Sequence, residues 1–169
     1  MIWVAPLSCL DRTLRETGAR DLLSLLSVGA AFERPDGLDP ARCLHLVMHD
    51  IAEPRDGMVA PSPGHVAAIL DFGRRWSREK PLLIHCFAGI SRSTAAAYAI
   101  AAALQPGRDE ALLAAELRRL APSATPNPLI VAHADALLGR QGRMIAAIRA
   151  IGRGAEAFEG TPFRLDIAA

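Results

Sequence analysis

Residues 84–93 read IHCFAGISRS, so five residues separate one cysteine from one arginine in this stretch. Cys86 follows an apolar run, residues 81–84, and an Ala-rich run, residues 94–104, comes soon after the arginine. These patterns predict a strand, a tight loop and a helix N-terminus, an order in which loop amides and the helix dipole bind an anion. Arg92 adds a planar fork of donors that matches two phosphate oxygens.

Cys86 is expected at the bottom of this anion site. Donors and positive charge around a cysteine favour its thiolate, which is the nucleophilic form. A thiolate inside a phosphate cradle can attack phosphorus and form a covalent phosphocysteine. Since Arg92 and the amides already neutralise phosphate charge, no metal or other cofactor is needed. The residues expected to bind phosphate are Phe87, Ala88, Gly89, Ile90, Ser91 and Arg92.

The same stretch resembles the signature loop of the cysteine-dependent protein tyrosine phosphatases, and its AGISRS form is most similar to the dual-specificity branch. The match includes the histidine before the cysteine, the glycine in the third loop position and the serines on both sides of the arginine. The resemblance covers roughly residues 44–128 and implies a compact, bacterial-type phosphatase. It also implies that His85 orients the loop through hydrogen bonds and that Ser93 donates to the departing thiolate.

Hydrolysis by this route also needs a general acid, because the leaving alkoxide or phenoxide must gain a proton. Asp50 follows the predicted strand 43–48, and the carboxyl ends of parallel strands meet where Cys86 is expected. It precedes Cys86 by 36 positions (86 − 50), which resembles the spacing of the family's acid. Its loop contains Pro and Gly residues that suit a hinged lid, and the carboxylate would later activate water. The alternative acids are His49, Glu53 and Asp56.

Asn127 stands between two prolines, after a predicted helix over 109–120. In the dual-specificity branch a similar Pro-Asn pair braces the active-site loop, so the resemblance implies a supporting role for Asn127. The alternative is that Asn127 caps the following helix. Residues 129–135, LIVAHAD, depart from the family's pattern because they lack its aromatic residue and its glutamine. The family's water-positioning glutamine therefore has no counterpart in this segment.

The rest of the chain alternates between strand and helix patterns, which indicates an α/β fold with a central, mostly parallel sheet flanked by helices on both faces. We expect a single phosphatase domain over residues 1–169. Strands are predicted over 2–7, at a sheet edge, and over 21–28, 43–48 and, in the centre, 81–85. Helices are predicted over 11–20, 63–78, 94–104, 109–120, 128–138 and 143–151.

The composition narrows the class of protein. With 169 residues and 51% hydrophobic residues, the chain can bury an ample core, and its composition argues against disorder. The net charge of +1 and the lack of a basic tract argue against a nucleic-acid partner. No apolar run approaches the ~20 residues of a membrane span. No His or Cys spacing fits a metal site, and the N-terminus lacks a secretory signal, so a cytoplasmic protein is expected.

The expected substrate is a phosphorylated protein or a small phosphomonoester. The loop interior carries no lysine or second arginine, which weighs against inositol polyphosphates and inositol lipids. A phosphate- or phosphoprotein-binding module without turnover is one alternative, but it would lack a placed acid. A sulfur- or arsenate-handling redox protein is the other, and it would be favoured by a second cysteine near the first.

Overall fold

Five strands form one sheet in the order β3-β2-β4-β1-β5 in the computed structural model, which describes residues 1–167. The strands are β1 (Ile2–Pro6), β2 (Asp21–Leu26), β3 (Cys43–Val47), β4 (Leu82–Cys86) and β5 (Phe163–Leu165). Neighbours among β1 to β4 pair in parallel, and β5 pairs antiparallel with β1. The helices are α1 (Leu10–Thr17), α2 (Pro63–Arg75), α3 (Arg92–Leu104), α4 (Glu110–Leu120), α5 (Pro128–Leu137) and α6 (Arg143–Ile151).

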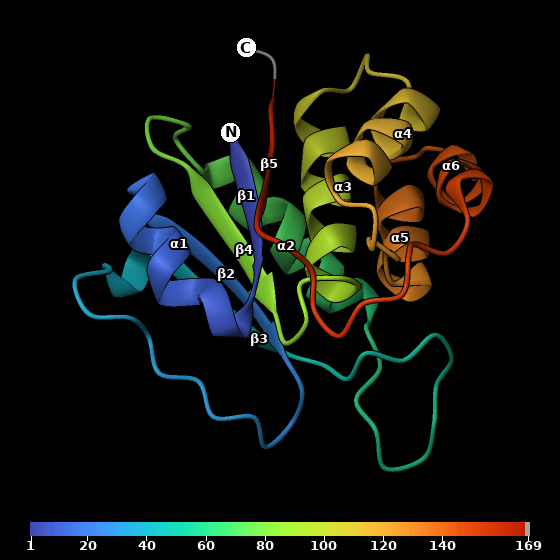
Figure 1. The fold of residues 1–169 in the computed structure, drawn as a ribbon. Helices are drawn as coiled ribbons and strands as arrows, with labels where there is room; N and C mark the ends of the chain where they lie inside the picture. Colours follow the sequence, from blue (N-terminus) through green and yellow to red (C-terminus); the bar gives the residue numbers. More distant parts are fainter. Residues whose placement is uncertain (168–169) are drawn as a thin grey trace.

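Helices cover both faces of the sheet, as predicted: α1 lies on one face and α2 to α6 lie on the other (Figure 1). Successive side chains of a strand point to opposite faces, so β4 serves both layers. Leu82 and Ile84 pack in the larger core with α2 and α3, whereas Leu83 packs in the smaller core with α1. This double burial explains why the strand reads as one continuous apolar run.

Two expectations about the strands differ from the structure. The prediction that β1 lies at an edge is wrong, because β5 pairs with its outer side. With only three residues, β5 is too short for an alternating pattern to show in the sequence. The strand predicted over 21–28 ends at Leu26, which leaves Ser27 outside the ladder at the carboxyl end of the sheet.

The carboxyl ends of the parallel strands meet at one edge of the sheet and bring distant residues together. β4 ends at Cys86 and α3 begins at Arg92, while Ser27 and Asp50 follow β2 and β3. The predicted central position of β4 is confirmed by the strand order. No helix within residues 1–167 is both long and apolar enough to cross a membrane.

Candidate active site

The loop over residues 86–92, called here the phosphate loop, turns its carbonyl groups outward. Four of these carbonyls accept backbone hydrogen bonds from other segments: Phe87 from Leu7 (3.0 Å), Ala88 from Gly160 (2.8 Å), Ile90 from Thr125 (3.0 Å) and Ser91 from Asn127 (3.3 Å). In a trans peptide unit the N–H points away from the carbonyl. The amides of residues 88, 89, 91 and 92 therefore face the inside of the loop, where they can bind an anion.

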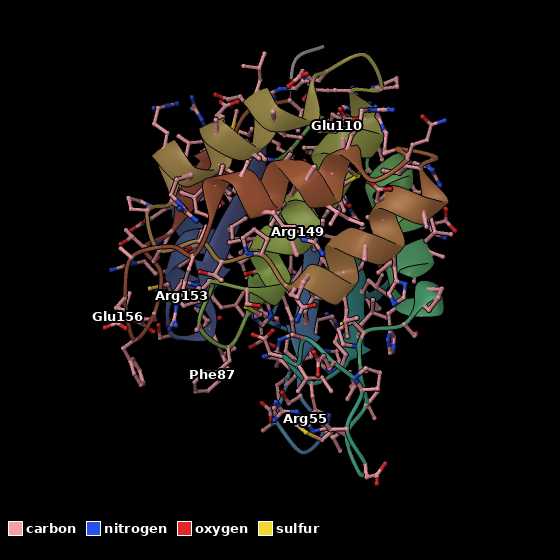
Figure 2. The ribbon with its side chains drawn as sticks, turned by 90° about the vertical axis from the view of Figure 1, so that its right-hand side faces the viewer. Arg55, Phe87, Glu110, Arg149, Arg153 and Glu156 are labelled. Carbon is pink, nitrogen blue, oxygen red and sulfur yellow. The ribbon has the colours of Figure 1, made fainter. Side chains whose placement is uncertain are left out.

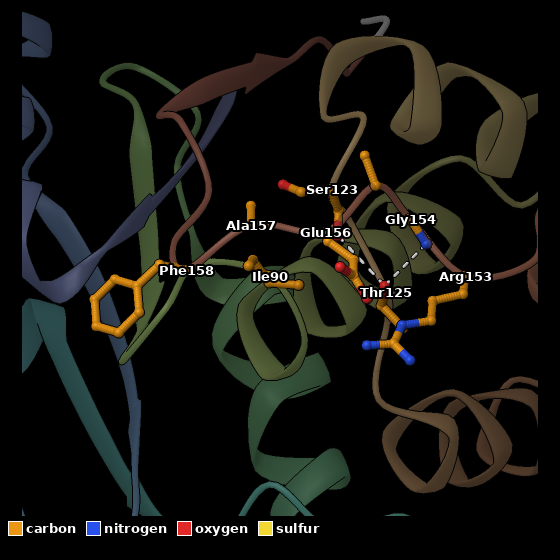
Figure 3. Close-up of a pocket in the computed structure, with 9 residues that line it drawn as sticks. Ile90, Ser123, Thr125, Arg153, Gly154, Glu156, Ala157 and Phe158 are labelled. Carbon is orange, nitrogen blue, oxygen red and sulfur yellow. Dashed lines mark hydrogen bonds between the residues drawn. The ribbon is translucent and has the colours of Figure 1, made fainter.

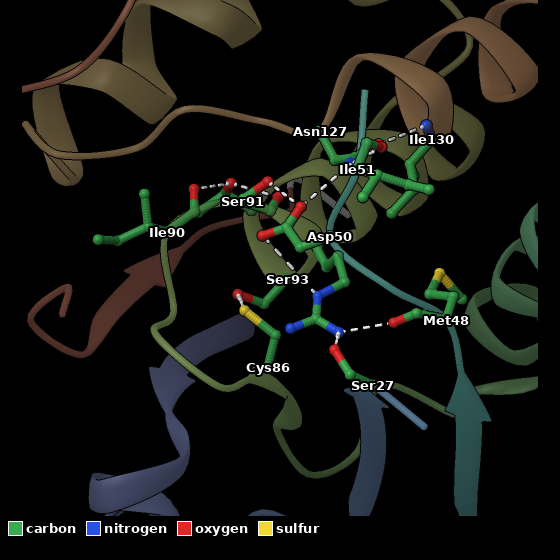
Figure 4. A network of polar contacts seen from close by, with 12 residues as sticks. Ser27, Met48, Asp50, Ile51, Cys86, Ile90, Ser91, Ser93, Asn127 and Ile130 are labelled. Atoms are coloured by element: carbon green, nitrogen blue, oxygen red, sulfur yellow. Dashed lines mark hydrogen bonds and ion pairs between the residues drawn. The ribbon is translucent and has the colours of Figure 1, made fainter. Parts of the chain in front are cut away.

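The Cys86 side chain lies at the base of this cradle, and the residue is only 1% exposed. Its Sγ accepts a hydrogen bond from the Gly89 amide at 3.3 Å and lies 3.1 Å from Ser93 Oγ (Figure 4). When Cys86 is a thiolate, only the Ser93 hydroxyl can donate in that pair. Both donors would stabilise negative charge on the sulfur.

Gly89 has a backbone conformation that no other residue could adopt here without displacement. Its φ is +69°, and a Cβ at this position would lie 2.6 Å from Pro6 N and 2.9 Å from the Ala5 carbonyl carbon. The neighbours are backbone atoms at the end of β1, so they cannot move aside as a flexible side chain could. The close approach of the phosphate loop to β1 thus requires glycine.

We expect Gly89→Ala to lower both activity and stability, because the new methyl group would push the phosphate loop away from β1. A displacement of about 1 Å in a catalytic loop can cost about 10²-fold in kcat/KM. Gly139→Ala is the matched control, since Gly139 has a φ of +64° and open space around its Cβ position. The control should lose only about 1–2 kcal/mol of stability from the left-handed backbone. Thermal unfolding and hydrolysis of p-nitrophenyl phosphate test both variants, and equal behaviour would contradict the prediction.

Arg92 is 4% exposed and is held from one side of its guanidinium. Nη1 donates to Ser27 Oγ at 3.1 Å and to the Met48 carbonyl at 2.7 Å. Nε is buried and has no hydrogen-bond partner among the described residues, and the nearest Asp50 oxygen is 3.9 Å away. A buried donor without a partner is unfavourable. A phosphate oxygen in the cradle would supply the missing acceptor.

Ser27 is a site residue that the sequence analysis missed. It follows β2 directly and lies 65 positions before Arg92, whose guanidinium it helps to hold. The rule that ligands gather at the carboxyl ends of parallel strands applies to β2 as much as to β3. A serine just after the second strand was therefore a usable signal for this edge of the sheet.

Asp50 lies against the phosphate loop, as the sequence analysis expected. Its Oδ1 accepts hydrogen bonds from Ser91 Oγ at 2.7 Å and from Asn127 Nδ2 at 2.8 Å, and its side chain is 35% exposed (Figure 4). A carboxyl group held this way remains open to a ligand above the loop. The arrangement suits a proton donor that reaches the oxygen leaving a phosphate ester.

The alternative acids have other surroundings. The His49 ring is turned back on its own loop, where Nδ1 accepts a hydrogen bond from Val59 N at 2.9 Å. The His49 amide also donates to Val59 O at 2.7 Å. This contact joins the two ends of the loop over residues 49–59, called here the acid loop because it carries Asp50. Glu53 and Asp56 are exposed and, within the described residues, make none of the contacts with the phosphate loop that Asp50 makes.

Asn127 combines the two roles that the sequence left open. Its Nδ2 donates to Asp50 Oδ1 and to the Ile51 carbonyl, at 2.8 and 3.1 Å. Its Oδ1 caps α5 by accepting from the amides of Leu129 and Ile130. Asn127 is 2% exposed and therefore links the acid loop, the phosphate loop and α5 in one buried joint.

His85 is buried under the phosphate loop. Neither ring nitrogen makes a hydrogen bond of regular geometry with the described residues, although the Cys86 backbone interacts with the ring in the sense that raises its pKa. The ring also packs against Phe32, with ring centroids 5.8 Å apart. Burial lowers the pKa of His85 to about 4, which keeps the imidazole neutral at physiological pH. The histidine thus supports the loop by packing.

A cavity of about 310 Å³ opens above the phosphate loop. It has a polar side, formed by Ser27, Asp50 and Arg92, and an apolar side. The apolar lining consists of Leu26, Ala30, Phe87 and Ala88. Within the described part of the chain, no group of three or more His, Cys, Asp or Glu residues could hold a metal ion.

No family model matches this chain, and neither does any curated protein. Solved structures do match it. DUSP15 is 20% identical, with a TM-score of 0.58 over 89% of each chain. The PTP-2 phosphatase of Cydia pomonella is 16% identical, with a TM-score of 0.59 over 80% of this chain and 84% of its own. Tk-PTP in its active form is 23% identical, with a TM-score of 0.55 over 77% of this chain and 86% of its own.

These likenesses define the class of fold. The chain has the α/β fold of protein tyrosine and dual-specificity phosphatases, and the fold that the resemblance implied is confirmed.

Proposed function

We propose that this protein is a metal-independent phosphomonoester hydrolase of the protein tyrosine phosphatase type, with Cys86 as its nucleophile. The observation that carries the proposal is the meeting of three groups in one cradle. Cys86 lies below inward-facing amides, Arg92 Nε has no hydrogen-bond acceptor among the described residues, and Asp50 accepts a hydrogen bond from the same loop. The solved structures with the same fold include phosphatases, which supports this reaction class.

In the first step, the Cys86 thiolate attacks phosphorus from the floor of the cradle. A bond forms between Sγ and phosphorus, and the bond between phosphorus and the ester oxygen breaks. Asp50 gives its proton to that oxygen, so the leaving group departs as a neutral alcohol or phenol. The loop amides and Arg92 stabilise the charge that develops on the equatorial phosphate oxygens.

In the second step, water hydrolyses the phosphocysteine. Asp50, now a carboxylate, removes a proton from the water by microscopic reversibility, and the Sγ–phosphorus bond breaks. The sulfur leaves as a thiolate that accepts from Ser93 Oγ and Gly89 N, the two donors already near it. Inorganic phosphate is released and the nucleophile is restored.

The contacts of Cys86 support hydrolysis over the two alternative classes. A silent phosphate-binding module would need no proton donor, yet Asp50 is held at the loop by two hydrogen bonds. A redox protein on this loop would need a second thiol to resolve the first. The hydrogen-bond neighbours of Cys86 Sγ are a hydroxyl and an amide.

Hydrolysis of p-nitrophenyl phosphate in the presence of EDTA tests the proposal. We expect turnover without metal, competitive inhibition by vanadate, and a phosphoenzyme that can be trapped by rapid acid quench. Turnover that requires an added metal, or activity that appears only with a thioredoxin-type reductant, would overturn the proposal.

We also propose one domain over residues 1–169, a cytoplasmic location, and a phosphorylated protein or small phosphomonoester as substrate.

We expect Asp50→Asn to slow hydrolysis in a way that depends on the leaving group. General acid catalysis contributes about 10²–10⁴-fold, so kcat for phenyl phosphate should fall by about that much. The loss for 2,4-dinitrophenyl phosphate should be far smaller, because its leaving group departs without protonation. Asp56→Asn, in the same loop but exposed, is the control and should retain full activity. An equal loss on both esters would show that Asp50 is not the general acid, and His49 would then be tested in that role.

A further inference from the structure

A second cavity of about 780 Å³ lies beside the phosphate loop and is lined in part by Ile90 (Figure 3). Ile90 is a phosphate-loop residue, so this groove borders the catalytic site. The other lining residues come from two segments, the connection between α4 and α5 and the chain that follows α6. They are Ser123, Thr125, Arg153, Gly154, Ala155, Glu156, Ala157 and Phe158.

The groove is tied to the phosphate loop on both sides. Thr125 N donates to the Ile90 carbonyl at 3.0 Å, and Gly160 N donates to the Ala88 carbonyl at 2.8 Å. The two walls are also joined to each other, because Gly154 N donates to Thr125 Oγ1 at 3.1 Å. The groove is thus preformed, and its position relative to the cradle is set by hydrogen bonds.

Arg118 strengthens the wall from below. Its guanidinium donates to the Ala124 carbonyl at 2.8 Å, and to the carbonyls of Ile151 and Gly152 at 2.7 and 2.9 Å. All three acceptors belong to the segments that form the groove or lead into it. These hydrogen bonds hold the two segments that form the groove against each other.

The groove has one side for a charged group and one for an apolar group. Arg153 makes no side-chain hydrogen bond or ion pair within the described residues, while Glu156 is the one carboxylate in the lining. Phe158 is 87% exposed and lies on the same side of the groove as Ile90, opposite Arg153 (Figure 3). Phe87, Arg153 and Glu156 lie toward the same end of the molecule (Figure 2).

Some exposed apolar side chains lie on the segments that form the two cavities. Nine large hydrophobic side chains are exposed within the described residues, and five of them lie on segments that carry site residues or border the groove. Those five are Val28, Met58, Val59, Phe87 and Phe158. Phe158 lines the groove and Phe87 lines the catalytic cavity, so each cavity offers one exposed aromatic side chain to a bound chain.

We propose that the groove is a substrate subsite that binds the chain beside the phosphate-bearing residue of a phosphorylated protein. An apolar side chain packs between Ile90 and Phe158, and an acidic side chain pairs with Arg153. This inference rests on the proposed function, and it selects a protein over a small phosphomonoester, which would occupy only the catalytic cavity. A lipid surface fits less well, because Glu156 accompanies Arg153 among the lining residues and Arg153 is the single basic residue among them.

Peptide hydrolysis tests the subsite. The probes are phosphotyrosine and phosphothreonine peptides in which each position within three residues of the phosphoresidue is in turn Ala, Glu or Leu. Wild type should prefer Glu at one position and Leu at another. Arg153→Gln should reduce the Glu preference by about fivefold, as an exposed ion pair allows. Phe158→Ala should reduce the Leu preference by about tenfold, as lost apolar burial allows.

The controls are Arg149→Gln and Leu112→Ala, which alter exposed side chains outside the groove. All four variants should hydrolyse p-nitrophenyl phosphate as wild type does. If wild type fails on that small ester, the proposed function itself fails. If the ester is hydrolysed but Arg153→Gln and Phe158→Ala leave both peptide preferences unchanged, the subsite is overturned. It is also overturned if these variants instead lose binding to anionic phospholipid vesicles.

Discussion

We expect Cys86→Ser to abolish the proposed hydrolysis of phosphomonoesters and to leave the fold intact. A serine hydroxyl is a far weaker nucleophile than a thiolate, and Asp50 is assigned to the leaving-group oxygen and not to the nucleophile. The loss in kcat should be roughly 10⁴–10⁶-fold, the range seen when a covalent nucleophile is removed. The replacement is nearly isosteric, so the contacts with Ser93 and the Gly89 amide can persist.

Steady-state hydrolysis of p-nitrophenyl phosphate and circular dichroism check this prediction. Cys43→Ser is the matched control, because Cys43 begins β3 at the opposite end of the parallel strands and should not affect turnover. The Cys86→Ser protein should still bind vanadate or phosphate, since the amides and Arg92 remain. Activity within tenfold of wild type would remove Cys86 from its assigned role.

The second large effect is expected for Arg92→Lys, in which the charge is kept and the fork is lost. Nη1 is occupied by Ser27 and Met48, which leaves the Nε side of the guanidinium for phosphate. A lysine ammonium cannot hold these two neighbours and also present a planar pair of donors to the ligand. Removing a preorganised donor to the transition state costs about 10²–10³-fold in kcat, so a loss of at least that size is expected.

The measurement is kcat/KM on p-nitrophenyl phosphate, together with the inhibition constant of inorganic phosphate. Arg74→Lys is the control, because Arg74 is an exposed residue of α2 that pairs only with Asp71 in the described structure. Ser27→Ala should give a smaller loss in the same direction, since the Met48 carbonyl still holds Nη1. Near-normal kinetics for Arg92→Lys would show that charge alone suffices.

The elements that can be predicted from sequence are those whose signals are local. The helix predicted from residue 63 begins there as α2, where Pro63 stands in the first turn and the Ser62 hydroxyl accepts from His65 N. Asn127 caps α5 in the same way. Caps and first-turn prolines act within one helical turn, so neighbouring residues carry all the information needed. The ends of strands were less accurate, because pairing partners decide them.

The details that escaped prediction depend on contacts between distant parts of the chain. β5 is a strand only because β1 has a free edge for it. His85 stands before the cysteine as the resemblance implies, but its packing against Phe32, a residue 53 positions earlier (85 − 32), appears only in the tertiary structure. Neither fact could be inferred from residues next to these positions, since packing across the sheet decides both.

The sequence by itself determined the chemistry of the cradle, because residues 86–92 are contiguous and their order predicts a strand, a loop and a helix start. Only the tertiary structure decided which distant groups complete it. Ser27 and Asp50 reach Arg92 across separate strands, and Leu7, Thr125 and Gly160 turn the loop carbonyls outward. These contacts exist because parallel strands bring their carboxyl ends to one edge, where segments remote in sequence become neighbours.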